Sequence, residues 1–238
     1  MMRRLVLVSG LLCNDLLWQD VIVGLKSQFK ETLDITIADT FKDNSIDAMA
    51  RRLLEDVHDD FWIAGLSMGG FVAQAVLRQQ KSRVKGLALL NSSARSDNEI
   101  QLKNREKMIK RASFGTFKGI ADSLLPMLVH LDRINDRSLC DKIYRMILSL
   151  DRDVYIRQQQ ALANRKAGFD VLSGIEDIPV LILTGREDIL TPLELQEEMS
   201  SLVHHGQLKI IEQCAHLSTL EQPKQVVQAL TNWLERSE

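Results

Sequence analysis

A serine flanked by glycines is the first feature of this sequence that could carry out chemistry. Ser67 is the centre of Gly65-Leu66-Ser67-Met68-Gly69, a G-x-S-x-G pattern between an apolar stretch at 61–64 and a helical pattern that begins at residue 68. A serine hydroxyl is a weak nucleophile at neutral pH, so it needs an exposed position and a nearby base. Glycines at 65 and 69 would let strand and helix pack closely around a strained turn. The motif predicts a nucleophile, although ordinary turns share this composition.

A histidine within hydrogen-bond reach would have to act as the base. His216 follows a predicted strand at 208–211, so it lies on a loop at the strand's carboxyl end, the edge where Ser67 should also lie. The sequence has four other histidines, in a helix end, in the middle of the chain and in a turn before a strand: His58, His130, His204 and His205. Position relative to the strands therefore favours His216 as the base.

A carboxylate is needed to orient that histidine and to stabilise its protonated form. Asp188 lies on the loop after the predicted strand at 179–184, and Glu187 beside it is a rival. A loop aspartate before a helix also has an ordinary structural explanation, as a cap. The chain order Ser67, Asp188, His216 nevertheless matches the nucleophile, acid and histidine order of one known triad architecture.

The negative oxygen that develops during acyl transfer needs hydrogen-bond donors, and loss of one typically costs about 2.7 to 4 kcal/mol. The backbone amide of Met68 directly follows the nucleophile and begins a helix. A second donor is expected on the loop after the first strand, where Gly10 opens a turn and the amide of Leu11 would face the site. We predict an oxyanion hole formed by these two amides.

The surrounding elements alternate between strand and helix. Strand patterns lie at 5–9, 35–38, 61–66, 84–90, 179–184 and 207–211, and helical patterns at 15–27, 45–57, 68–77, 192 onwards and 223–234. This alternation is typical of βαβ units, so it predicts an α/β fold with a doubly wound, mostly parallel sheet.

Residues 96–172 have a different texture. They contain helical periodicity without a convincing strand, with expected breaks at Gly115, Gly119, Pro126 and Asn135-Asp136, which indicates about four short helices. We expect a core of residues 1–95 and 173–238 and a helical lid of residues 96–172 above the strand ends, where ligands bind in open α/β sheets. The alternative is a packing subdomain that never contacts substrate.

Two sets of side chains could act in substrate binding. Apolar residues that could line an acyl pocket are Leu12, Leu124, Leu125, Met127, Leu128, Met146 and Leu217, although such stripes also form ordinary helix-packing cores. Basic residues at the start of the insertion, opposed only by Glu106, are Lys103, Arg105, Lys107, Lys110 and Arg111. They form either a solvated helix face or a docking site for an acidic acyl carrier protein.

Composition excludes several classes of protein. In 238 residues, 30 Lys and Arg oppose 32 Asp and Glu, so the net charge of −2 gives no reason to expect a nucleic-acid partner. Three cysteines without a C-x-x-C pair argue against a disulfide framework and a zinc site, and no metal or cofactor is expected. No apolar run reaches the ~18 residues that span a bilayer. We expect a cytoplasmic monomer or homodimer without a membrane span, with residues 5–9 as a core strand rather than a secretion signal.

The sequence resembles the α/β-hydrolase superfamily, specifically its small bacterial serine hydrolases and carboxylesterases with a helical lid. The resemblance is carried by five segments: 9–13 with Trp18, 64–70, 87–91, 184–188 with Pro192, and 214–218 with 221–223. It implies a Ser67-His216-Asp188 triad, oxyanion donors at Met68 and Leu11, and no cofactor. Ser9 stands where many relatives have histidine. The chain also starts almost at what would be the third strand, so about six strands are expected and the first edge hairpin is expected to be missing.

These features together predict a serine hydrolase that cleaves a carboxylic ester through an acyl-enzyme intermediate. Cleavage of acyl-carrier-protein methyl esters, thioesters, lactones or C–C bonds remains an alternative, as does cofactor-free perhydrolysis. A non-catalytic small-molecule binding protein on the same fold is an alternative of another class. The serine disfavours dehalogenase or epoxide hydrolase chemistry, because those relatives use an aspartate at this position.

Overall fold

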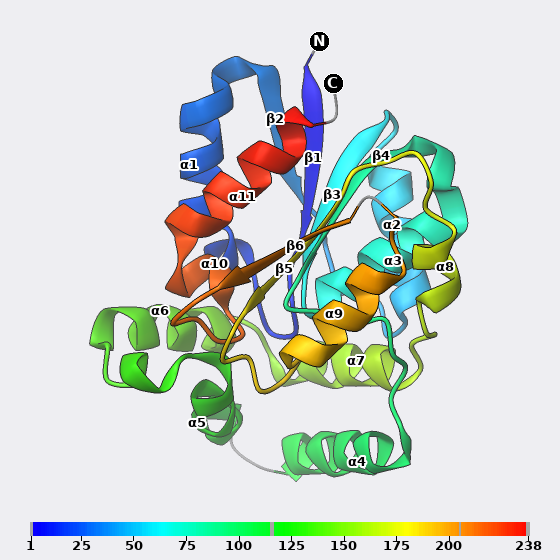
Figure 1. The fold of residues 1–238 in the computed structure, drawn as a ribbon. Coiled ribbons are helices and arrows are strands. Elements are labelled where there is room, and N and C mark those ends of the chain that lie inside the picture. Colours follow the sequence, from blue (N-terminus) through cyan, green and yellow to red (C-terminus); the bar gives the residue numbers. More distant parts are fainter. Residues whose placement is uncertain (1, 115–116, 205, 237–238) are drawn as a thin grey trace.

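Six parallel strands form the centre of the protein. The computed structural model describes residues 2–114, 117–204 and 206–236 (Figure 1). In these residues the strands run in the order β2-β1-β3-β4-β5-β6, and all five pairings are parallel. The strands are β1 (Arg3–Val8), β2 (Leu33–Ile37), β3 (Phe61–Leu66), β4 (Val84–Leu90), β5 (Val180–Gly185) and β6 (Gly206–Ile211). The predicted α/β fold with a parallel sheet of about six strands is confirmed.

The register aligns the carboxyl ends of the strands along one edge. Val8 pairs with Gly65, Leu66 with Leu90, and Gly185 with Ile211. From β1 the chain first adds β2 on one side and then β3 on the other, so the winding direction reverses between β1 and β3. Such a switch point is where open α/β sheets bind ligands. The loops after β1, β3, β4, β5 and β6 therefore meet at this edge.

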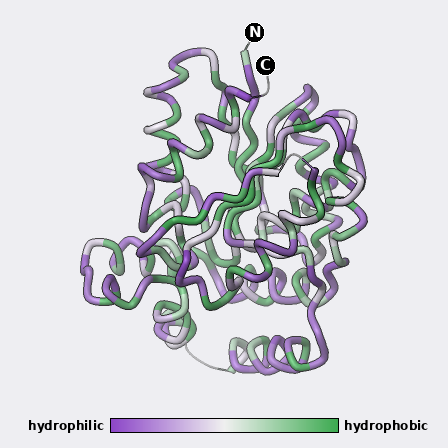
Figure 2. The backbone as a smooth tube through the Cα atoms, in the orientation of Figure 1, coloured by the Kyte–Doolittle hydropathy of each residue, from purple (hydrophilic) through white to green (hydrophobic). Residues whose placement is uncertain are grey.

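Helices cover both faces of the sheet (Figure 1). One face carries α1 (Gln19–Phe29), α10 (Ser218–Glu221) and α11 (Pro223–Glu235), and the other carries α2 (Ile46–Asp56), α3 (Met68–Gln80), α8 (Phe169–Ser173) and α9 (Leu193–Ser201). Because successive side chains of a strand point to opposite faces, Leu5 and Leu7 of β1 pack in one core while Val6 and Val8 pack in the other. Figure 2 shows this hydrophobic interior following the strands.

The segment 96–172 is helical in its described part and extends beyond the carboxyl ends of the strands (Figure 1). Its longer helices are α4 (Glu99–Phe114), α5 (Phe117–Leu128), α6 (Arg137–Leu148) and α7 (Arg152–Ala163).

Short 3-10 turns occur at η1 (Asp15–Leu17), η2 (Lys30–Thr32), η3 (Lys81–Arg83) and η4 (Leu131–Arg133). No described helix combines the length and the apolar character needed to cross a membrane.

Two of the predicted helix breaks are wrong. Gly119 and Pro126 both lie inside α5, the first near its start and the second near its end. Glycine costs a helix conformational entropy and proline removes one hydrogen bond, but the burial of Ile120, Ala121 and Leu125 offsets both, so the helix continues through them. The break at 135–136 is confirmed, because Asp136 caps α6 by accepting from the Leu139 N–H. Gly115 lies outside the described residues.

Candidate active site

Ser67 occupies a sharp turn between β3 and α3. Its φ of 55° and ψ of −115° are unusual for a residue with a side chain. The turn is tied to the neighbouring strand, because the Ser67 N–H donates to the Leu90 carbonyl at 2.9 Å and the Ser92 hydroxyl donates to the Ser67 carbonyl at 2.9 Å. The side chain is half-buried, so the hydroxyl sits at the rim of the sheet rather than inside the core.

The glycines of the motif are required by close backbone approach. A Cβ on Gly65 would lie 2.2 Å from the Gly69 carbonyl oxygen, and a Cβ on Gly69 would lie 2.1 Å from the carbonyl oxygen of Val8. Neither distance is compatible with any side chain, so α3 can pack this tightly against β1 and β3 only with glycine at both positions. The steric role predicted from the sequence is confirmed.

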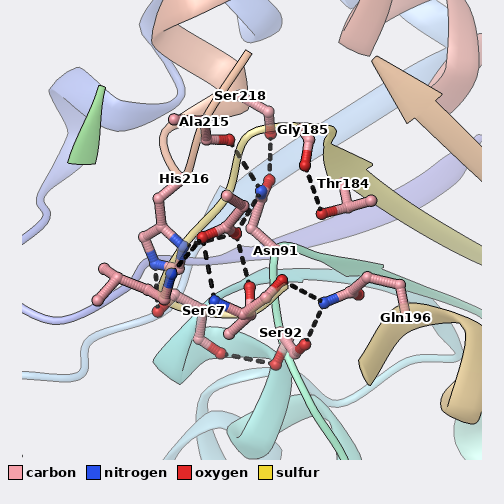
Figure 3. A network of polar contacts seen from close by, with 12 residues as sticks. Ser67, Asn91, Ser92, Thr184, Gly185, Gln196, Ala215, His216 and Ser218 are labelled. Carbon is pink, nitrogen blue, oxygen red and sulfur yellow. Dashed lines mark hydrogen bonds and ion pairs between the residues drawn. The ribbon is translucent and has the colours of Figure 1, made fainter. Parts of the chain in front are cut away.

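His216 bridges Ser67 and Asp188. Its Nε2 lies 2.9 Å from the Ser67 Oγ (Figure 3). Its Nδ1 lies 2.9 Å from the Asp188 Oδ2. The histidine follows β6 and the aspartate follows β5, so the aligned strand ends bring together residues that are far apart in sequence. His216 and Asp188 are almost fully buried. The structure therefore unites the three side chains that the sequence singled out, whereas His58 and His204 lie elsewhere.

Asp188 is surrounded by donors. Its Oδ1 accepts from the N–H groups of Leu190 and Thr191, and its Oδ2 accepts from the Thr191 hydroxyl at 2.6 Å and from the Asn91 amide at 2.8 Å. Burial by itself would raise the pKa of this carboxyl. The positive charge of protonated His216 and the hydrogen bonds from His216, Thr191 and Asn91 outweigh that effect and lower the pKa of Asp188 to about 2. Asp188 is thus held as a carboxylate.

Asn91 is a site residue that the sequence argument did not assign. It lies directly after β4 at a φ of 46°, and its Nδ2 donates to Asp188. The same Nδ2 donates to the Ala215 carbonyl at 3.1 Å (Figure 3). Its Oδ1 accepts from the Ser218 hydroxyl at 2.6 Å. One amide therefore joins the loop that carries the acid to the loop that carries the histidine. The available signal was a polar residue placed immediately after the buried apolar run at 87–90.

The loop after β1 lies against the serine turn. A Cβ on Gly10 would lie 3.3 Å from the Ser67 Cβ, and the Cys13 N–H donates to the Gly10 carbonyl at 3.2 Å, which closes a turn over Leu11 and Leu12. Ser9, the departure from the family pattern, is buried and its hydroxyl accepts from the Trp18 indole N–H at 3.2 Å. Of the predicted amide donors, Leu11 thus follows a glycine that lies against Ser67, and Met68 directly follows Ser67 in the chain.

The predicted pocket residues have different surroundings. Leu12, Leu125, Met146 and Leu217 are buried in one hydrophobic cluster, Leu124 and Leu128 pack against that cluster, and Met127 is half-buried. Arg105 is not part of the exposed basic face, because it forms an ion pair with the buried side chain of Asp97 and donates to Gln159. The remaining members, Lys103, Lys107, Lys110 and Arg111, are exposed.

In the part of the chain that the structure describes, the cysteines and potential metal ligands form no further centre. Cys13, Cys140 and Cys214 are buried free thiols, and burial raises the pKa of Cys13 to about 12. Among the residues that the structure describes, no three His, Cys, Asp or Glu side chains come close enough together to hold a metal ion. The groups that the structure brings together at this edge of the sheet are a hydroxyl, an imidazole and a carboxylate.

The geometry of this site agrees with the known proteins that the chain resembles. Residues 27–229 match the alpha/beta hydrolase family. A pimeloyl-[acyl-carrier protein] methyl ester esterase of Nitrosomonas europaea is 23% identical over 94% of this chain and 92% of its own. An (E)-2-((N-methylformamido)methylene)succinate hydrolase of Acinetobacter baylyi is 27% identical over 73% of this chain and 64% of its own.

A solved structure shows the same likeness. A thermophilic esterase from Thermogutta terrifontis superposes with a TM-score of 0.88 at 25% identity, covering 99% of this chain and 90% of that one. The chain belongs to the alpha/beta hydrolase family, and the resemblance inferred from the sequence is confirmed. It is a hydrolase, as the sequence predicted.

Proposed function

We propose that this protein is a serine hydrolase that cleaves carboxylic esters through an acyl-enzyme intermediate. The observation that carries the proposal is the unbroken chain of 2.9 Å contacts from Ser67 through His216 to Asp188. Esterases among the similar proteins support the substrate class. The reaction needs no group beyond the side chains and amides at this site.

Asp188 decides which nitrogen of His216 carries the proton. Since Asp188 is a carboxylate, His216 donates through Nδ1–H, and its Nε2 lone pair faces the Ser67 hydroxyl. Ser67 Oγ can then attack the ester carbonyl carbon while its proton passes to Nε2. The imidazolium that forms is stabilised by the buried carboxylate beside it.

Two half-reactions complete the cycle. The oxygen of the tetrahedral intermediate accepts from the amides of Met68 and Leu11, and His216 returns its proton to the departing alcohol, which leaves the acyl group on Ser67. A water molecule then attacks that acyl carbon while His216 takes a proton from the water. Collapse of the second intermediate breaks the bond to Oγ, returns the proton to Ser67 and releases the carboxylic acid.

Residues 96–172 act in this proposal as a lid that sets the acyl specificity. The carbonyl of Leu128, the last residue of α5, accepts from the Leu217 N–H at 3.0 Å, directly beside the histidine. Leu125 and Met146 share a hydrophobic cluster with Leu12 and Leu217, which adjoin the catalytic groups in the chain. The partly buried side chains at the edge of this cluster, Leu124 and Leu128, would contact the acyl chain of the substrate.

The test is replacement of the nucleophile. Ser67→Ala is expected to reduce kcat for short p-nitrophenyl esters by about 10⁴-fold or more, because no other group can form the acyl-enzyme. Ser113→Ala is a matched control, since Ser113 is exposed on α4 and its hydroxyl donates to the Ile109 carbonyl of the same helix. A fluorophosphonate probe should label the wild type and the control but not Ser67→Ala. Retained ester hydrolysis by purified Ser67→Ala would exclude this mechanism.

A substrate panel separates the alternatives within this mechanism. Esters, thioesters and lactones of matched acyl length would be compared by kcat/KM in the wild type and in Ser67→Ala. Oxygen esters are expected to give the highest values. A preference for thioesters or lactones would change the assigned substrate class but would retain the acyl-enzyme mechanism. A wild-type protein that neither hydrolyses these substrates nor reacts with the fluorophosphonate probe would be a binding protein.

A carrier-linked ester is a second candidate substrate, supported by the exposed basic face of α4. Lys103, Lys107, Lys110 and Arg111 follow at helical spacing and, within the described part of the chain, make no ion pair. A relative is named for acting on a methyl ester held on an acyl carrier protein. Such carriers are acidic, so this face would attract them at low salt.

Charge reversal tests the carrier proposal. Lys107→Glu with Lys110→Glu is expected to raise KM for a methyl ester on an acyl carrier protein severalfold at low ionic strength and to leave p-nitrophenyl ester hydrolysis unchanged. Arg105 is kept, because its ion pair with Asp97 belongs to the fold. The double variant Lys26→Glu with Lys224→Glu, on α1 and α11, is the control that matches the change in net charge. Equal carrier kinetics in all three proteins would remove this candidate.

A further inference from the structure

Leu12 adopts a conformation that its side chain disfavours. The turn from Gly10 to Cys13 is closed by a hydrogen bond, and Leu12 is its third residue with a φ of 55°. Turns with a positive φ at this position normally carry glycine, because a Cβ crowds the backbone there. Leu12 is fully buried in the hydrophobic cluster. Burial of its side chain therefore explains why this position has leucine, although the turn geometry favours glycine.

A glutamine from the helical insertion holds this turn. Gln158 lies in α7 with 0% of its side chain exposed, and its Oε1 accepts from the Leu12 N–H at 2.9 Å. Its Nε2 donates to the Thr40 carbonyl at 3.2 Å, on the loop that follows β2. One partner is a donor and the other an acceptor, so only one orientation of the amide satisfies both.

The hydrogen bond acts on the peptide that determines the turn. If the peptide between Leu11 and Leu12 flipped, Leu12 would reach an ordinary negative φ, but its N–H would then point away from Gln158 and remain buried without a partner. The Leu11 carbonyl of the same peptide accepts a weak hydrogen bond from the Cys13 thiol at 3.3 Å. Both contacts favour the observed turn, and that turn sets the direction of the preceding Leu11 N–H.

We infer that Gln158 is a positioning residue for the oxyanion hole. It holds Leu12 at positive φ so that the Leu11 amide faces the carbonyl oxygen attached to Ser67. The inference rests on the proposed acyl-enzyme mechanism and gives α7 a role in the chemical step in addition to any role in substrate binding. Loss of Gln158 should therefore weaken transition-state stabilisation more than substrate binding.

The test compares two adjacent buried glutamines of one helix. Gln158→Met keeps the side-chain length and removes the acceptor, and it is expected to lower kcat for p-nitrophenyl esters about tenfold or more while KM changes less than about twofold, since loss of an oxyanion donor costs about 100-fold or more. Gln159→Met is the control, because Gln159 is equally buried but bonds Arg105 and Met108 on α4. Its kcat should stay close to the wild-type value.

Two further variants separate positioning from general damage. Gln158→Glu retains an oxygen for the Leu12 N–H, so its kcat should exceed that of Gln158→Met even if both are less stable. In a Leu12→Gly background, where positive φ is unstrained, Gln158→Met should cost much less kcat than in the wild type. Each protein would be assayed well below its melting temperature, as determined by circular dichroism.

The outcomes also separate this inference from the proposed mechanism. If Ser67→Ala abolishes hydrolysis but Gln158→Met and Gln159→Met behave alike, or if Gln158→Met changes only KM, Gln158 does not position the oxyanion loop. An equal effect of Gln158→Met in both backgrounds would lead to the same conclusion. If Ser67→Ala remains active, the mechanism itself fails.

Discussion

Asp188 accepts five hydrogen bonds, and only one of them comes from His216. Two backbone amides hold one oxygen, while Thr191, Asn91 and His216 share the other. The neighbouring carboxylate of Glu187 has a different partner, the Cys214 N–H at 3.0 Å, and its side chain is 38% exposed. Of the two candidate acids in this loop, Asp188 is therefore the one that contacts the histidine and the one whose charge is isolated from water.

Replacing this carboxylate by an amide should reverse the tautomer of the histidine. In Asp188→Asn the new amide would donate to Nδ1 of His216, so that Nε2 would carry the proton and could no longer accept one from Ser67. We expect kcat to fall by about 10⁴-fold with little change in KM. Ester hydrolysis and the rate of fluorophosphonate labelling would both report the loss. A decrease below tenfold in a folded Asp188→Asn protein would show that another group orients His216.

The low pKa of Asp188 also predicts a dependence of stability on pH. Its pKa is about 2 in the folded protein against an ordinary value of 3.8, so the folded state binds the proton more weakly than the unfolded state. The resulting stabilisation, about 2 kcal/mol, is complete above about pH 5 and is lost as the pH falls towards 2. Urea unfolding of the wild type between these pH values should show a loss that Asp188→Asn lacks. Parallel pH curves for the two proteins would contradict this prediction.

At the scale of elements, the loop that carries His216 is fastened to the helical insertion by a buried carboxylate. Glu221 accepts from the Ala215 N–H at 2.9 Å through one oxygen and from the His130 N–H at 2.7 Å through the other. Burial raises the pKa of this carboxyl, although the two backbone donors act in the opposite direction. Arg133 donates to the Glu221 carbonyl at 2.6 Å. Glu221 thus joins two segments: the loop that carries His216 and the junction between α5 and η4.

Removal of this anchor should destabilise the protein. Glu221→Ala would leave the buried N–H groups of Ala215 and His130 without an acceptor, and we expect it to lower the free energy of unfolding by about 2 to 4 kcal/mol. Glu221→Gln keeps one acceptor and should cost less. Chemical denaturation would measure both, with Glu235→Ala at the exposed end of α11 as the control. A Glu221→Ala protein as stable as this control would show that the junction carries no stability.

The elements show which parts of the site the sequence could predict. Ser67, Asp188 and His216 each follow an apolar strand, and parallel strands place their carboxyl ends at one edge, so local pattern and sheet geometry were sufficient. Gln158 contacts Leu12, 146 residues away in the sequence, and Glu221 contacts His130, 91 residues away. Local sequence patterns do not predict contacts at such separations. The breaks assigned to Gly119 and Pro126 failed for a related reason, because the buried face of α5 overrides local helix propensity.

At the scale of the whole molecule, most of the insertion shares the core of the sheet. Side chains of α5, α6 and α7 belong to the hydrophobic cluster that also contains Leu5 and Leu7 of β1. This continuity predicts that the insertion and the sheet unfold together. The helix that contributes least is α4, which has Ala112 as its one buried residue among 16 and leaves Ile100 and Phe114 72% and 85% exposed.

Hydrogen exchange should therefore divide the insertion into two parts. Local opening is easiest where few apolar side chains are buried, so amides of α4 are expected to exchange at least about tenfold faster than those of α6, which buries Leu139, Cys140, Ile143, Met146 and Ile147. The two helices are of comparable length and serve as mutual controls in one mass-spectrometry experiment. Because α4 packs mainly on α7 while its basic side chains face outward, it can open without exposing the sheet or the Ser67 site. Equal protection of α4 and α6 would mean that the ion pairs and hydrogen bonds of Arg105 with Asp97 and Gln159 are enough to join α4 to the cooperative core.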